Sequence, residues 1–133
     1  MFNYEYQDAD QDFKPIGDGP ANFIIHEVDT KDAFGDPLLS KAGAPKIVVK
    51  MKLSNNRGES GLAFEHITAK NAYKLGQICN AIGRPDLYGP HGDIDPEILL
   101  GKSGTCNLVK EGKYVQVQEY NVKVAQSMDE IPF

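Results

Sequence analysis

Apolar and polar residues alternate in several short stretches of the chain, which is the pattern of half-buried β-strands. Residues 46–53 alternate most regularly, with an apolar face of Ile47, Val49, Met51 and Leu53 and a second face of Lys46, Val48, Lys50 and Lys52. β-Branched and aromatic residues also favour strands at 23–28 and 62–67. Two more strands are expected at 105–109 and, after a glycine turn, at 114–124.

The apolar spacing changes to that of a helix after residue 68. Ala72, Leu75, Cys79 and Ile82 follow one another at intervals of 3, 4 and 3 residues, which places them on one helical face. Thr68 is suited to cap this helix, Gly83 is suited to end it, and Pro85 prevents its continuation. Asp95-Pro96-Glu97 predicts the start of a second, short helix that ends at Gly101.

Three strands, a helix and two further strands are the element order of an OB-fold, a five-stranded Greek-key barrel. We therefore expect an all-β fold with one main helix between strands 3 and 4, although other small β-barrels and α+β sandwiches accommodate the same order. A chain of 133 residues suits one domain. We expect an acidic arm at 1–12, the OB-fold domain at 13–124 and an acidic tail at 125–133.

Composition narrows the class of protein. Hydrophobic residues make up 41% of the chain, enough to fill a core, and Cys79 and Cys106 are too few for a disulfide-built scaffold. The first residues lack the pattern of a secretory signal, and no apolar stretch is long enough to span a bilayer. We expect a cytoplasmic protein with no membrane association.

The net charge of −5 disfavours a polyanionic partner until the distribution of charge is considered. The acidic residues at 1–12 and 125–133 have no basic neighbours within those segments. Residues 31–84 contain nine lysines and arginines against four aspartates and glutamates. The middle of the chain is therefore basic.

Binding of single strands without sequence preference combines cations along the phosphates with aromatic rings that stack on bases. No tryptophan is present, so stacking would fall to Phe, Tyr or His. The alternatives are that the lysines are solvated and that Phe64, Tyr114 and Tyr120 are core residues. The candidate nucleic-acid-binding residues are Phe34, Lys41, Lys46, Lys50, Lys52, Arg57, Phe64, His66, Tyr114 and Tyr120.

The last residues combine an acidic pair with an apolar end: Asp129, Glu130, Ile131, Pro132 and Phe133. The terminal ring and carboxylate would suit a partner pocket with an apolar wall and a basic rim, and Pro132 lowers the entropy lost on docking. This end resembles the acidic C-terminal tip of bacterial and phage single-stranded-DNA-binding proteins, which commonly finish on Ile-Pro-Phe. The body is similar to phage-encoded relatives at 40–49 and at Leu100-Gly101-Lys102.

That resemblance implies an OB-fold that coats single-stranded DNA during replication, repair or recombination, while residues 129–133 recruit partner enzymes. For a phage-encoded protein the location would be the host cytoplasm. Near the other end, Phe2, Tyr4 and Tyr6 alternate with polar residues. We expect this arm to pack on the barrel, because its acidic residues would repel phosphates.

Enzymatic interpretations find little support in the sequence. Gly101-Lys102-Ser103 resembles the end of a P-loop, but proline occupies the position of the required glycine. The histidines and cysteines lack the close pairs of a zinc site, so we expect no metal and no cofactor. A non-enzymatic coat protein is favoured. The alternatives are a protein-only adaptor that does not bind DNA and an inhibitor that mimics acidic DNA.

Overall fold

The computed structural model describes residues 1–5, 14–90, 92–112 and 114–122. Its five strands are β1 (Gly19–Asp29), β2 (Lys46–Ser54), β3 (Ser60–Thr68), β4 (Ser103–Glu111) and β5 (Tyr114–Tyr120). The α-helix α1 (Tyr73–Ala81) lies between β3 and β4, together with the 3-10 helices η1 (Ala69–Asn71), η2 (Pro85–Leu87) and η3 (Pro96–Leu99).

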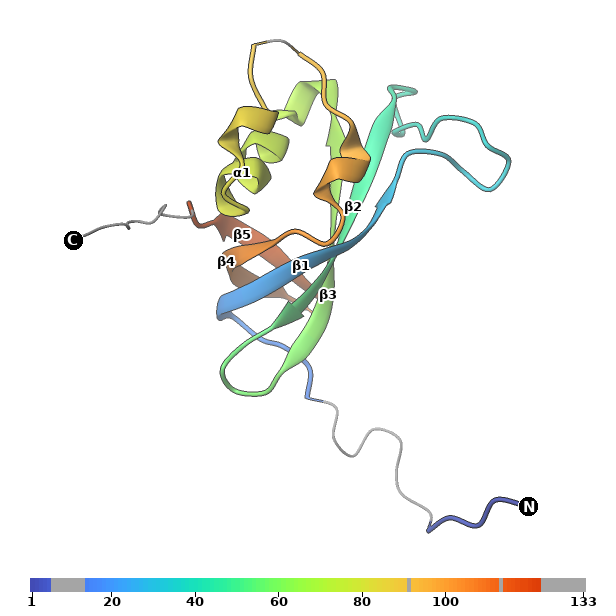
Figure 1. The fold of residues 1–133 in the computed structure, drawn as a ribbon, viewed down its shortest axis with the longest axis vertical. Coiled ribbons are helices and arrows are strands. Elements are labelled where there is room, and N and C mark those ends of the chain that lie inside the picture. Colours follow the sequence, from blue (N-terminus) through green and yellow to red (C-terminus); the bar gives the residue numbers. More distant parts are fainter. Residues whose placement is uncertain (6–13, 91, 113, 123–133) are drawn as a thin grey trace, which may run out of the picture.

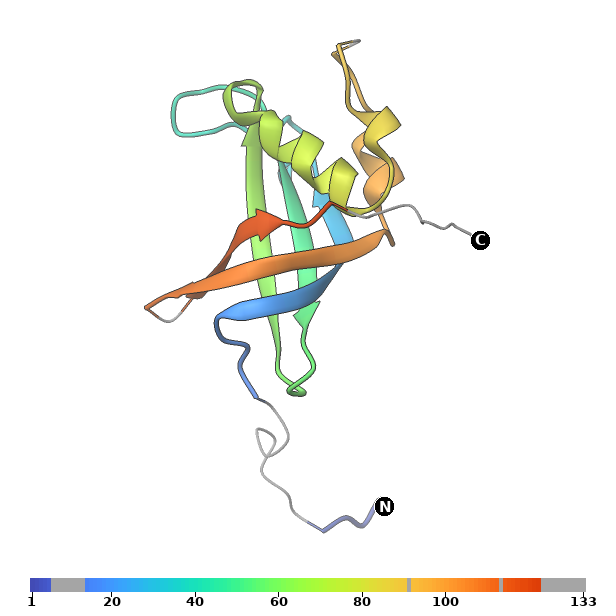
Figure 2. The same cartoon turned by 90° about the vertical axis from the view of Figure 1, so that its left-hand side faces the viewer.

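The strands form one antiparallel sheet in the order β3-β2-β1-β4-β5. The sheet curls until its two outer strands approach each other, which gives the nearly closed barrel of Figures 1 and 2. A hydrogen bond of 2.6 Å from Tyr120 to Glu65 joins β5 to β3 across this seam. The strand order and the single main helix between strands 3 and 4 confirm the expected OB-fold.

The barrel interior is filled by alternate residues of the strands, as their burial patterns require. The largest fully buried side chains include Phe23, Ile25, Met51 and Val49 from β1 and β2. Helix α1 covers one end of the barrel (Figure 2) and adds Ile78 to this core. Cys79 and Cys106 are also buried, and neither forms a disulfide.

Close contact between α1 and β4 depends on a glycine. A Cβ at Gly104 would lie 2.6 Å from the carbonyl oxygen of Ala81 and 2.9 Å from Cζ of Phe23. Both distances are too short for a side chain, so only glycine lets the helix approach the strand this closely.

The predicted helices differ from the observed ones at their ends. Thr68 is a cap, as predicted, but it caps η1, and its side chain accepts a hydrogen bond from the backbone of Lys70. The α-helix begins only at Tyr73. Asp95 caps η3 as expected, although this element is a 3-10 helix. The 3-10 helix η2, which begins at Pro85, was not predicted.

The arm at the start of the chain does not follow the prediction in its described part. Residues 1–5 are exposed and lie apart from the barrel in Figure 1. Phe2 and Tyr4 stack on each other, with ring centroids 6.1 Å apart. Packing of these two rings on the barrel was therefore a wrong expectation. Tyr6 and most of the acidic residues of the arm lie outside the described residues.

Candidate nucleic-acid interface

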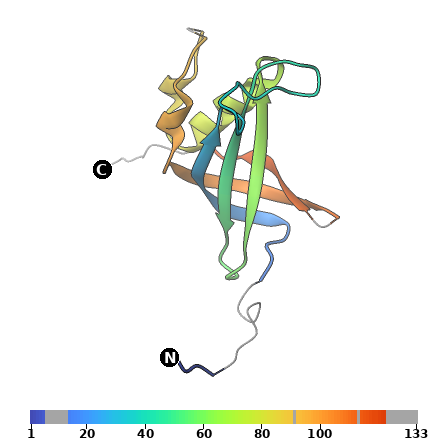
Figure 3. The ribbon, with the colours of Figure 1, turned by 90° about the vertical axis from the view of Figure 1, so that its right-hand side faces the viewer.

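The outer face of β2 carries lysines, as the alternation predicts. Val49, Met51 and Leu53 point into the barrel and are buried, while Lys50 and Lys52 point outward. Figure 3 shows β1, β2 and β3 side by side, so this outer face continues onto both neighbouring strands. The strand register places Lys50 between Glu27 on β1 and Phe64 on β3. It places Lys52 between Ile24 on β1 and Leu62 on β3.

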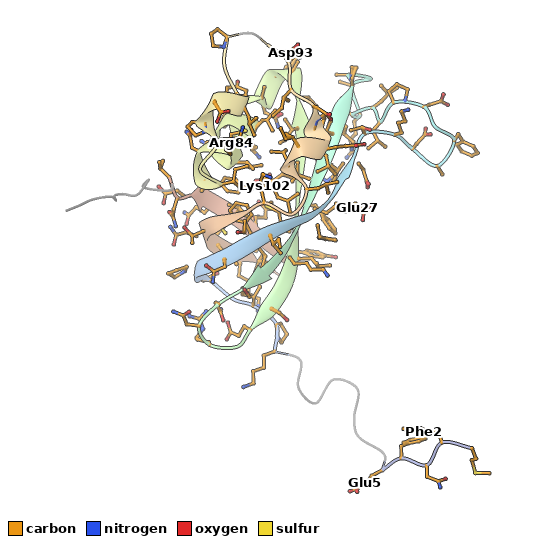
Figure 4. All side chains as sticks on the ribbon, viewed as in Figure 1. Phe2, Glu5, Glu27, Arg84, Asp93 and Lys102 are labelled. Atoms are coloured by element: carbon orange, nitrogen blue, oxygen red, sulfur yellow. The ribbon has the colours of Figure 1, made fainter. Side chains whose placement is uncertain are left out.

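Lys50 is neutralised by its neighbours on β1. Its Nζ lies 2.8 Å from Oδ2 of Asp29 and 3.4 Å from Oε2 of Glu27, which Figure 4 labels at the outer edge of the strand. The hydrogen bond with Asp29 raises the pKa of Lys50, and the same bond lowers the pKa of Asp29. A phosphate at this position would have to compete with two carboxylates for the ammonium group.

The other two lysines of this face have different surroundings. Nζ of Lys46 lies 3.3 Å from Nδ1 of His66 on β3. Lys52 is exposed and makes no ion pair with any described residue. Both lysines are therefore available to an anionic ligand. Lys50 is not available while it is paired with Asp29 and Glu27.

Phe64 lies on the surface. Its side chain points outward from β3 and remains 53% exposed, with Nζ of Lys50 5.9 Å from the ring centroid. Residues 62, 64 and 66 share this outer face, while Ala63, Glu65 and Ile67 point inward. Phe64 therefore presents a ring face beside the lysines, which is the arrangement that base stacking requires.

A groove of about 690 Å³ runs along the seam between β3 and β5. Its walls include Phe64 and His66 from β3 and Tyr114 from β5, where Tyr114 is 73% exposed. Lys74 of α1 also lines the groove, with its Nζ 3.5 Å from Oε1 of Glu65. Three of the predicted ligand-binding side chains are thus brought to one concave surface from strands far apart in the sequence.

Tyr120 does not lie on this surface. Its ring packs edge-to-face on Phe23 at 5.6 Å, and its hydroxyl donates a hydrogen bond of 2.6 Å to Glu65. Burial and the neighbouring Glu65 carboxylate raise the pKa of Tyr120. Tyr120 is therefore part of the barrel interior, and the expectation that it stacks on bases does not fit its position.

Arg57 is occupied within the turn between β2 and β3. Its Nη2 lies 3.0 Å from Oε1 of Glu59 and donates a second hydrogen bond of 3.1 Å to the carbonyl oxygen of Asp18. The hydrogen bond from Arg57 lowers the pKa of Glu59 to about 2. These contacts tie the turn to the segment before β1, so Arg57 has a structural task and lies apart from the groove.

Phe34 and Lys41 lie at two turns of the loop between β1 and β2, and both are exposed. The structure does not bring them together with the groove residues, because neither lines it. The predicted partner-binding residues 129–133 lie outside the described residues, so their role stays a prediction.

Sequence reasoning missed three residues of this surface. Ile24 and Leu62 are exposed on either side of Lys52, and Lys74 reaches the groove from α1. Alternation within β1 was the available signal for Ile24, because Phe23 and Ile25 on either side both point inward. Nothing in the local sequence of the helix indicates that Lys74 faces β5.

No family model matches the chain, and no curated protein matches it. Within the described ranges, no three His, Cys, Asp or Glu side chains form a group that could hold a metal ion. None of the helices in the described part of the chain is long and apolar enough to cross a membrane.

Proposed function

We propose that the protein binds single-stranded DNA without strong sequence preference, in replication, repair or recombination. The observation that carries this proposal is the meeting of Phe64, His66 and Tyr114 at one groove, beside the lysine-bearing face of β2. In OB-folds the face of strands 2 and 3 is a common binding surface for oligonucleotides. Residues 129–133 would recruit partner enzymes.

The energetics of two stacked bases make the proposal reasonable. Each base on an aromatic ring contributes about 1–3 kcal/mol, and every base has a face that can stack. Phe64 and Tyr114 would supply the two rings. Lys46 and Lys52 would follow the phosphates, which adds a salt-dependent contribution without sequence preference.

The test is a fluorescence titration of the full chain with oligo-dT over a range of salt concentrations. We expect log K to fall with log salt at a slope of about −0.7 for each phosphate contact. Lys52→Ala should make the slope shallower, whereas Lys102→Ala, at the residue that precedes β4, should not. Phe64→Leu and Tyr114→Leu should each weaken binding about fivefold or more, with Tyr73→Leu on α1 as the matched exposed control.

The pairing of Lys50 gives a further arm of the same experiment. Asp29→Asn removes one of the two carboxylates that hold its ammonium group. If this surface meets phosphate, the variant should bind oligo-dT more tightly at low salt than the wild-type protein. Unchanged affinity in all these variants would contradict the proposed interface.

A second candidate is a protein-only adaptor that presents residues 129–133 without touching DNA. The neutralisation of Lys50 by Asp29 and Glu27 favours the adaptor, because the central lysine of a phosphate-binding surface is not expected to be paired with two carboxylates. Absence of oligo-dT binding by the wild-type protein at low salt would decide for the adaptor.

A further inference from the structure

An apolar pocket of about 420 Å³ lies on a different part of the surface from the seam groove. It opens between the start of β2, the end of β3, the start of α1 and residues 88–89 and 92–96. A cavity of about 150 Å³ can hold a benzene ring. The pocket is thus large enough for an aromatic side chain, and its apolar lining includes Ile47, Ile67, Ala72, Leu75, Tyr88 and Ile94.

The walls of the pocket are held by specific contacts. The Tyr88 ring packs so closely on α1 that a Cβ at Gly76 would lie 2.8 Å from its Cδ2 atom. Asp95 fixes the following turn by accepting a hydrogen bond of 3.1 Å from the backbone of Glu97. Lys46 and Asp93 also line the pocket, and Figure 4 labels Asp93 at the end of the molecule where the pocket lies.

A suitable occupant is displayed on the same chain. Phe34 is 89% exposed at a turn of the loop between β1 and β2, which projects from the barrel in Figure 3. Oδ1 of Asp32 accepts hydrogen bonds from the backbone of Phe34 at 2.8 Å and of Asp36 at 3.0 Å, and Gly35 has the positive φ of 85° that the turn requires. The ring is therefore presented on an ordered turn, which lowers the entropy cost of docking.

The charges beside Phe34 favour a protein partner over DNA. Asp32 and Asp36 lie two residues before and after Phe34, and Lys31 lies at the base of the same turn, so the turn is net acidic and would repel phosphates. Lys46 and Asp93 both line the pocket, and a second basic residue, Lys70, follows the lining residue Ala69 in the sequence. The turn, with two acidic residues and one basic residue, and the pocket region, with two basic residues and one acidic residue, carry opposite net charges.

We propose that Phe34 of one copy of this protein inserts into the pocket of the next copy. The occupant comes from a second copy because the loop leads away from the barrel, whereas Pro45 and Lys46 at its base line the pocket. A ring on one surface and a pocket on another make a head-to-tail contact, and such contacts build an open chain of subunits when the rotation between copies does not close a ring. This inference rests on the proposed function, because the contact would make the coating of a DNA strand cooperative.

The contact is expected to be weak in free solution. One ring in one pocket falls well below the area of about 1,000 Å² that marks a stable interface. Copies bound side by side on one strand experience an effective concentration in the millimolar range, which is enough to populate a weak contact. Association should therefore be concentration-dependent without DNA and strong on long strands.

The experiment uses the full chain with two matched variants, Phe34→Ala, which keeps the pocket, and Ala72→Phe, which fills it. Sedimentation equilibrium at high protein concentration should show self-association of the wild-type protein. Neither variant should self-associate on its own. An equal mixture of the two variants should form a dimer that does not grow, because only one functional ring and one functional pocket remain. Circular dichroism and urea unfolding check that both variants are folded, and Ile94→Glu provides a second pocket variant.

Titrations with poly-dT and with a short oligo-dT that holds one copy connect the contact to DNA. Each variant should lower cooperativity on poly-dT about tenfold or more and leave affinity for the short oligonucleotide within about twofold. A monomeric, non-cooperative wild-type protein would overturn the inference. So would loss of short-oligonucleotide affinity in Phe34→Ala, or association that survives Phe34→Ala but not Ala72→Phe. Failure of the proposed function has a different signature, since a protein that binds no oligonucleotide can still self-associate through Phe34.

Discussion

Tyr120→Phe removes one hydroxyl group from the barrel interior and leaves the ring in place. That hydroxyl donates a hydrogen bond of 2.6 Å to Glu65, the one buried charged side chain in the part of the chain that the structure describes. The bond joins β5 to β3, which share no ladder of backbone hydrogen bonds. The variant therefore tests how much this single contact contributes to closing the barrel.

The expected loss follows from the chemistry of the pair. A hydrogen bond to a charged group contributes about 1.5–3 kcal/mol, and the buried acceptor loses one of its partners when the hydroxyl is removed. Lys74 remains 3.5 Å from the other carboxylate oxygen of Glu65 and retains part of the stabilisation. We expect the free energy of unfolding to fall by about 2 kcal/mol. The packing of the ring on Phe23 should be preserved, because phenylalanine has the same ring.

Urea unfolding at pH 7 measures this loss, with Tyr114→Phe as the matched control. Tyr114 lies on the same strand and is 73% exposed, so removing its hydroxyl should change stability by less than about 0.5 kcal/mol. A double-mutant cycle with Glu65→Gln isolates the coupling between the two side chains. Equal stabilities of the two Tyr→Phe variants, or a coupling energy near zero, would refute the reasoning.

The same residue predicts a pH dependence. Burial and Glu65 raise the pKa of Tyr120 in the folded protein above the value of about 10 for an unfolded chain. Above that pH the unfolded state releases a proton that the folded state keeps, so stability should fall as pH rises, by up to about 1.4 kcal/mol per pH unit. The wild-type protein should lose stability more steeply than Tyr120→Phe above about pH 10. Parallel curves would show that Tyr120 does not contribute.

Two further predictions concern the helix contact and the turn after β2. Gly104→Ala should destabilise the protein by about 1–3 kcal/mol in urea unfolding, because the new Cβ would meet the carbonyl oxygen of Ala81. Gly17→Ala is the control, because a Cβ at Gly17 meets no atom within 4 Å. Equal urea midpoints for the two variants would contradict the tight contact at Gly104. The pKa of Glu59 is lowered from 4.5 to about 2 by the hydrogen bond from Arg57, so its contribution to stability should be lost as pH falls through this window. Glu59→Gln should reduce the acid sensitivity of the thermal midpoint, and an unchanged pH profile would count against the pairing.

Most of the fold could be predicted from period-2 alternation and from turn and cap residues. The apolar faces of 46–53 and the helical spacing after Thr68 depend only on local sequence, and both lead to the correct elements. The first four strands extend beyond their predicted ends, because a ladder of backbone hydrogen bonds continues through polar residues such as Ser54 and Ser60. The fifth strand was predicted to continue to residue 124 but ends at Tyr120. Apolar patterning cannot detect those pairs.

The site was harder to predict than the fold, because its concave surface is made by strands that are distant in sequence. Phe64 and Tyr114 were recognised as candidates, but only the closure of the barrel brings β3 and β5 to one groove. Lys74 needed the packing of α1 as well. Neither arrangement leaves a signal in any single stretch of residues.

Two β-bulges explain where alternation failed. A bulge inserts one residue and moves the side chains beyond it to the other face of the strand. In β5, opposite Asn107 and Leu108, the register shifts between Val117 and Glu119, so Tyr120 turns into the barrel although strict alternation from Tyr114 would place it outside.

In β1 the register shifts between Ile25 and Glu27. Strict alternation from the buried Ile25 would direct Glu27 and Asp29 inward, but the bulge places both on the outer face, within 3.4 Å and 2.8 Å of Lys50. One insertion thus removes an aromatic ring from the predicted interface, and the other neutralises its central lysine. The bulges leave Lys46 and Lys52 on the outer face, with the rings of Phe64 and Tyr114 at the seam groove, and the strength of any strand binding has to come from that smaller set.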